Sequence, residues 1–108
     1  MTYPAGDPRS IDPFELFCAY HLGITPDDTY RASSLLDVAR RFRVRPDTIE
    51  QALLHHAMDH ESVKHSDFDL SLAQMDIQVS PAGVSKRELA RNLYAEFRSA
   101  SRGTLWNP

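Results

Sequence analysis

The side chains best suited to hold a metal ion gather in residues 55–65, HHAMDHESVKH, which contain four of the chain's five histidines. If one helix ran through this segment, His56 and His60 would lie one turn apart on the same face, a spacing that zinc ligands often use. The spacing does not indicate a third ligand for a metal ion. The same residues are also typical of a polar helix end whose histidines are exposed to solvent. We therefore expect no metal site and no cofactor, with His56 and His60 as the weak candidates.

A thiol and an imidazole lie three residues apart, at Cys18 and His21, as a nucleophile and its base could. Cys18 stands between Phe17 and Ala19, however, and a cysteine in such an apolar setting usually fills a core. It is the only cysteine in the chain, which excludes an internal disulfide and a thiolate metal cluster. The sequence also lacks a glycine-rich phosphate loop and a nucleophile elbow. We expect no catalysis and no small-molecule substrate.

Charged residues that could bind a macromolecule are sorted into zones along the chain. Residues 31–45 carry five arginines against a single acid, whereas residues 46–80 carry seven acids against one lysine. The net charge is only −3. The zones therefore either neutralise one another inside the fold or present a surface of two signs to a partner.

Helix-start signals indicate the elements that must position these side chains. Each signal is a capping residue or a proline that is followed by apolar residues at helical spacing. Four such signals occur, at Asp12-Pro13, Ser34, Pro46 and Ser85. Residues 67–79 fit both the helix period and the strand period, and we predict a short helix over 67–75 followed by an extended segment near 76–80. The last helix is predicted to end near Ala100.

These patterns predict an all-α fold, a compact bundle of four or five short helices. Its predicted parts are a flexible arm at 1–10, a single helical domain at 11–100 and a tail at 101–108. No stretch approaches the ~20 apolar residues of a membrane span, and the amino terminus lacks a basic start followed by an apolar run. We therefore expect no membrane partner and a cytoplasmic location.

Residues 35–54, LLDVARRFRVRPDTIEQALL, join two apolar-periodic segments through a proline-marked turn. This stretch resembles the helix-turn-helix of bacterial regulators such as phage repressors and Cro-type proteins. Ala39 takes the fifth position of that pattern, where a small residue lets the next helix cross closely, and Val44 and Ile49 take apolar positions. The resemblance implies two helices crossing at a steep angle as the centre of the bundle. Arg43 takes the turn position that usually holds glycine, and it either adopts a positive φ or distorts the turn, at a cost of about 1 kcal/mol.

Two functions remain open for this stretch. A protein-interaction or regulatory module would bind another protein or a second copy through Asp47, Glu50, Gln51, Leu54, Arg87 and Arg91. A DNA-binding transcriptional regulator would instead use Arg40, Arg41, Arg43 and Arg45 on phosphates and Gln51 on a base. In that case Asp47 and Glu50 would face a polyanion, which weakens binding. We favour the interaction module for this reason.

Overall fold

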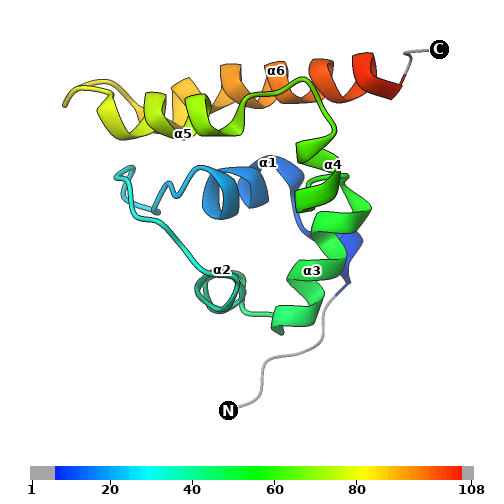
Figure 1. Ribbon diagram of the computed structural model, residues 1–108. Coiled ribbons are helices and arrows are strands. Elements are labelled where there is room, and N and C mark those ends of the chain that lie inside the picture. Colours follow the sequence, from blue (N-terminus) through cyan, green and yellow to red (C-terminus); the bar gives the residue numbers. More distant parts are fainter. Residues whose placement is uncertain (1–6, 106–108) are drawn as a thin grey trace.

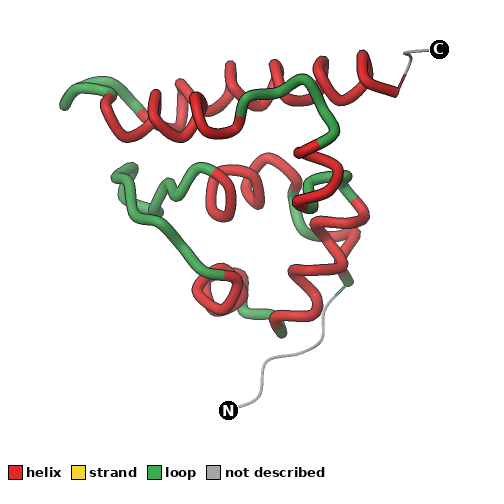
Figure 2. The backbone as a smooth tube through the Cα atoms, viewed as in Figure 1, coloured by secondary structure: helices red, strands yellow, loops and turns green. Residues whose placement is uncertain are grey.

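The fold is α-helical in the part of the chain that the structure describes, residues 7–105, of which 101–105 are described by their backbone alone. In this computed structural model the elements follow the order η1 (Pro8–Ser10), α1 (Pro13–Leu16), η2 (Phe17–His21), α2 (Leu35–Phe42), α3 (Pro46–His55), α4 (His60–Lys64), α5 (Leu70–Val79) and α6 (Lys86–Leu105). Figure 2 shows helices and loops and no strand in this part. The all-α prediction is confirmed.

The first helix begins at its predicted start signal. The Asp12 carboxylate accepts a hydrogen bond from the backbone N of Glu15 at 2.9 Å, which satisfies one free N–H group of the first turn. Helix α1 runs directly into the π-helical turn η2, and Gly23 ends this turn at a φ of +67°. The left-handed residue bends the chain back, so that the N–H of Ile24 reaches the carbonyl of Cys18 at 3.0 Å.

The turn η2 lies at the centre of the molecule. It contacts α1, α2 and α6, and Figure 1 shows α1 and its continuation between the α5–α6 pair above and α2 below. Its side chains Phe17 and Cys18 and the adjoining Leu16 and Leu22 have no exposed surface. The two pairs of helices are therefore joined through a short buried segment near the start of the chain.

Helices α2 and α3 pack against each other on one side of this segment, and Figure 1 shows α2 end-on and α3 from the side. The hydroxyl of Ser34 accepts from the N–H of Asp37 and the Asp37 carboxylate accepts from the N–H of Ser34, both at 3.1 Å, so the predicted cap is confirmed. Arg43 ends α2 at a φ of +57°, which is one of the two outcomes expected at this turn position. Val38 and Ala39 of α2 and four residues of α3 are buried: Thr48, Ile49, Ala52 and Leu53.

The prediction of an extended segment near 76–80 was wrong, because α5 continues as a helix to Val79. The apparent strand alternation came from Met75, Ile77 and Val79, which would share one face of a strand. In the structure Ile77 is fully buried, while Met75 and Val79 are 56% and 69% exposed. The three side chains therefore follow the helical period. Ile77 is buried in the core together with Ala73, which lies one turn earlier on the same face of α5.

Helix α6 packs along α5 and carries a cap from a distant loop. The Ser85 hydroxyl accepts from the N–H of Glu88 at 3.2 Å, as predicted. In addition, the carboxylate of Asp28 accepts from the N–H groups of Lys86 and Arg87 at 3.1 Å and 2.9 Å. Two further N–H groups at the start of α6 are thereby satisfied from the loop that follows η2.

The structure also revises the ends of the chain. Helix α6 continues to Leu105 rather than ending near Ala100, so its backbone includes five residues of the predicted tail 101–108. Of the predicted arm 1–10, residues 1–6 lie outside the described residues, and Pro8–Ser10 form the turn η1, which contacts α3.

Candidate interaction surface

The partner-binding residues that the sequence predicts on α3 share the outward side of that helix. Asp47, Glu50, Gln51 and Leu54 are all exposed, Leu54 to 56%. The carboxylate of Asp47 pairs with the Arg45 guanidinium at 2.6 Å. A partner that binds this side of α3 would therefore meet the carboxylate of Glu50, because that of Asp47 is paired, and the exposed side chain of Leu54.

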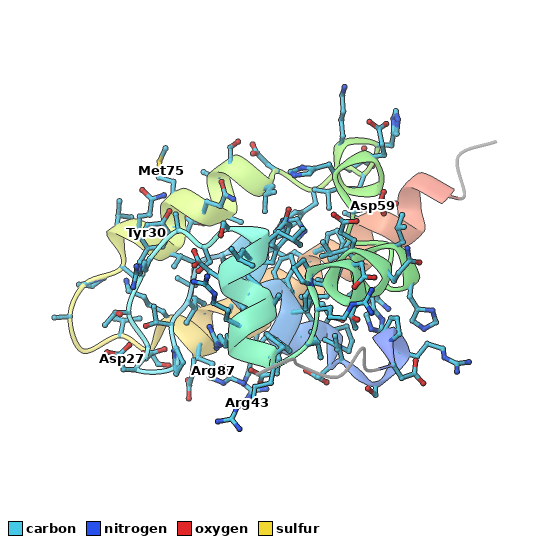
Figure 3. All side chains as sticks on the ribbon, turned by 90° about the horizontal axis from the view of Figure 1, so that it is seen from below. Asp27, Tyr30, Arg43, Asp59, Met75 and Arg87 are labelled. Atoms are coloured by element: carbon cyan, nitrogen blue, oxygen red, sulfur yellow. The ribbon has the colours of Figure 1, made fainter. Side chains whose placement is uncertain are left out.

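The arginines predicted for DNA phosphates have unequal surroundings. Arg41 is half-buried, and its guanidinium donates to the carbonyl of Ile24 at 2.6 Å. Arg45 is held by Asp47. Arg40 and Arg43 are exposed, and Figure 3 shows Arg43 pointing away from the molecule. Among the described residues, Arg40 and Arg43 are thus the two of the four arginines that are exposed and whose guanidiniums donate no hydrogen bond to the protein.

The structure does not bring Arg87 and Arg91 of α6 together with the predicted residues of α3. Arg87 forms an ion pair with Glu15. The guanidiniums of Arg87 and Arg91 lie 5.3 Å and 5.1 Å from the centroid of the Phe14 ring, within the range of a cation–π contact. Both arginines therefore fasten α6 to α1.

The weak metal candidates do not share a helix face. Helix α3 ends at His55, and Ala57 has a φ of +56°, so that His60 belongs to a separate helix, α4. The Nε2 atom of His56 lies 2.9 Å from the carbonyl of Ile11. Among the described residues no group of three or more His, Cys, Asp or Glu side chains is placed to hold a metal ion.

Cys18 and His21 are both buried in the core. Burial raises the pKa of the Cys18 thiol to about 12, which leaves no thiolate at neutral pH. The Nε2 atom of His21 lies 2.6 Å from the carbonyl of Met58 and, since a carbonyl only accepts, carries the proton of this hydrogen bond. The prediction that Cys18 fills the core is confirmed by its full burial.

The buried imidazole makes the stability of the protein depend on pH. Burial lowers the pKa of His21 below its usual 6.5, with a smaller lowering by the nearby His60. Above pH 6.5 the ring is neutral in both the folded and the unfolded chain, whereas below it the unfolded chain takes up a proton that the folded chain does not. We therefore expect the free energy of unfolding to fall as the pH drops below about 6.5, with a slope of up to ~1.4 kcal/mol per pH unit.

Urea unfolding at a series of pH values measures this slope, and His21→Gln is the matched variant because an amide can still donate to Met58. The pKa values of Asp7, Asp27, Asp37 and Asp59 are lowered from 3.8 by hydrogen bonds, so these groups act at more acidic pH. An unchanged slope in the variant would show that another group is responsible.

Sequence reasoning missed the outward face of α5. Leu72, Met75 and Val79 are 54%, 56% and 69% exposed and occupy two successive turns of one helical face, which we call the α5 stripe. Figure 3 shows Met75 extending beyond the ribbon on the side of Tyr30, whose hydroxyl accepts from Gln78 at 3.1 Å. The missed signal is that α5 has apolar residues on both faces, a composition typical of a helix covered on both sides.

A groove of about 180 Å³ lies between α5 and α6 beside the stripe. Leu72, Ala73 and Leu93 are among the apolar residues that line it. Four carboxylates also line it, and we call them the acidic rim: Asp67, Asp69, Asp76 and Glu96. Among the side chains that the structure describes, none of these four forms an ion pair.

Comparison with protein-family models, curated proteins and solved structures gives no match. The surfaces above are therefore the basis for a functional proposal. In the part of the chain that the structure describes, no helix is both long and apolar enough to cross a membrane.

Proposed function

We propose that this protein is a non-enzymatic protein-interaction module of a regulatory kind, and that its partner covers the α5 stripe. The single observation that carries the proposal is the exposure of more than half of Leu72, Met75 and Val79 on one face of a helix. Single exposed apolar residues are ordinary in proteins, but a contiguous patch marks a binding surface. Covering it contributes roughly 25 cal/mol for each Å² of apolar surface removed from water.

The α3 residues Asp47, Glu50, Gln51 and Leu54 are a second candidate contact surface in this proposal, because all four are exposed. Arg87 and Arg91 are less suited to a partner because they contact Glu15 and Phe14. We also propose a cytoplasmic location, which the single, buried thiol of Cys18 favours.

A photo-activated cross-linking residue at position 75 tests the proposal in cells of the native host. We expect a discrete adduct with a protein, which disappears when Leu72→Gln and Val79→Gln are added. The same cross-linker at the exposed position 36 of α2 controls for random collision. No adduct at position 75, or equal adducts at both positions, would overturn the proposal.

DNA binding is the second candidate function. It is favoured by the exposed guanidiniums of Arg40 and Arg43 and by the positive φ at Arg43, which fits the proposed likeness to helix-turn-helix regulators. A duplex mobility-shift assay at about 50 mM and about 200 mM salt separates the two functions, since phosphate contacts weaken steeply with salt. A salt-dependent shift that Arg40→Ala with Arg43→Ala abolishes would replace the interaction module by a DNA-binding regulator.

A further inference from the structure

Part of the acidic rim lies beside the α5 stripe. Leu72, Asp76 and Val79 fall on one side of α5, and Asp69 caps the start of that helix, so two carboxylates lie along the Leu72–Val79 row. The pocket between the two helices is lined by Asp76 together with Glu96 of α6. A ligand seated over Leu72 would therefore meet negative charge on both sides of the groove.

We propose that the α5 stripe and the acidic rim bind a cationic amphipathic helix of another protein, and this inference rests on the proposed function. Such a helix places apolar residues at i, i+3 or i+4, and i+7 into a groove and carries Lys or Arg at its flanks. The stripe from Leu72 to Val79 extends for roughly 10 Å along α5, which matches that spacing. The rim carboxylates, which form no ion pair with described side chains, supply complementary charge that fixes the orientation of the partner.

The size of the groove favours a side chain over a metabolite. Small-molecule sites usually enclose about 300–1,000 Å³, whereas this groove encloses about 180 Å³. A volume of this size suits one large apolar side chain of a partner helix, seated against Leu72 and Leu93.

A second copy of this chain is a poor occupant. The exposed side of α2 combines Leu36 with the cations Arg40 and Arg43, but it offers one apolar residue where the stripe extends over two turns. The exposed side of α3 presents Leu54 beside Glu50, whose charge has the same sign as the acidic rim. The complementary helix is therefore assigned to a different protein.

The experiment measures binding of a synthetic peptide to the full chain by fluorescence anisotropy. The probe is a peptide of about 20 residues with leucines at i, i+3 and i+7 and lysines on the flanks of the leucine row. A peptide of the same composition in scrambled order is its control. We expect the ordered peptide to bind at least tenfold more tightly than the scrambled one.

Matched charge reversals locate the binding surface. Asp76→Lys with Glu96→Lys reverses the rim without removing the capping carboxylate of Asp69, which accepts from the N–H of Leu72. Glu61→Lys with Glu88→Lys makes the same change of four charges at two exposed positions that do not line the groove. We expect the rim variant to lose at least tenfold in affinity and the control variant to lose less than twofold, with circular dichroism confirming that both are folded.

A parallel comparison tests the apolar contribution. Leu72→Ala with Val79→Ala should weaken binding at least fivefold, whereas Leu36→Ala with Val84→Ala, which truncates an exposed leucine and an exposed valine elsewhere, should leave it unchanged. Equal losses in the two charge-reversal variants, or equal binding of the scrambled peptide, would overturn the inference. Self-association of the unmodified chain that Arg40→Glu and Asp76→Lys both abolish would also overturn it, in favour of a second copy.

Failure of the cationic-helix inference can be distinguished from failure of the proposed function. The inference is refuted, and the proposed function is not, if an adduct forms at position 75 but peptide binding does not depend on the rim charges. Loss of the adduct at position 75 refutes the proposed function whatever the peptide does.

Discussion

Phe17→Ala is expected to lower the free energy of unfolding by about 3–5 kcal/mol, the cost of emptying a well-packed aromatic site. The Phe17 ring has no exposed surface and lies among Phe68, Tyr94 and Phe97, with ring centroids 6.0 Å, 5.3 Å and 5.2 Å away. Small domains are stable by only about 5–15 kcal/mol. The variant should therefore unfold at a much lower urea concentration, as followed by circular dichroism.

Phe17→Leu serves as the control because it keeps most of the apolar volume. The free energy of unfolding of this variant is expected to fall by less than about 1.5 kcal/mol. It also remains measurable if the alanine variant does not fold. A loss below about 1 kcal/mol for Phe17→Ala would contradict the central position that the structure gives to η2.

Gly23→Ala is expected to lower the free energy of unfolding by at least ~2 kcal/mol, from backbone strain and from a close contact. Gly23 has a φ of +67°, and a Cβ atom there would lie 2.8 Å from the carbonyl oxygen of Arg31. The chain cannot move apart easily at this point because the N–H of Arg31 donates to the carbonyl of Gly23 at 2.7 Å.

Gly83→Ala separates the two causes. Gly83 also has a positive φ, +93°, but nothing lies within 4 Å of a Cβ atom built there. The free energy of unfolding of Gly83→Ala is expected to fall by roughly 1 kcal/mol, because only the backbone conformation is strained. Equal urea midpoints for the two variants would show that the contact between Gly23 and Arg31 contributes nothing.

Local signals in the sequence were sufficient to locate most helix starts. Asp12, Ser34 and Ser85 each cap a helix through N–H groups within three residues, and such short-range geometry depends on residue type and spacing alone. The positive φ at Arg43 was expected only as one of two outcomes of the resemblance to helix-turn-helix proteins, because arginine itself rarely adopts it. The end of α6 was less predictable, since a helix end without a glycine or proline has no strong local signal.

Contacts between distant residues were not predictable from one sequence. Asp28 resembles an ordinary turn residue, and its contact with the start of α6 depends on how the loop packs. The DNA-binding alternative placed Arg41 on phosphates, but in the fold its guanidinium donates to the carbonyl of Ile24. The stripe on α5 was missed because the same apolar residues also fit a strand, and the choice between the two periods is made by the burial of Ile77.

The central position of η2 has a consequence for how the chain folds during synthesis. Phe17 is synthesised before Tyr94 and Phe97, which cover its ring and belong to α6. Contacts between residues so far apart in the chain form slowly because a long loop has to close first. The ring of Phe17 therefore lacks these two contacts until α6 has been synthesised, and chaperones can bind it during that interval.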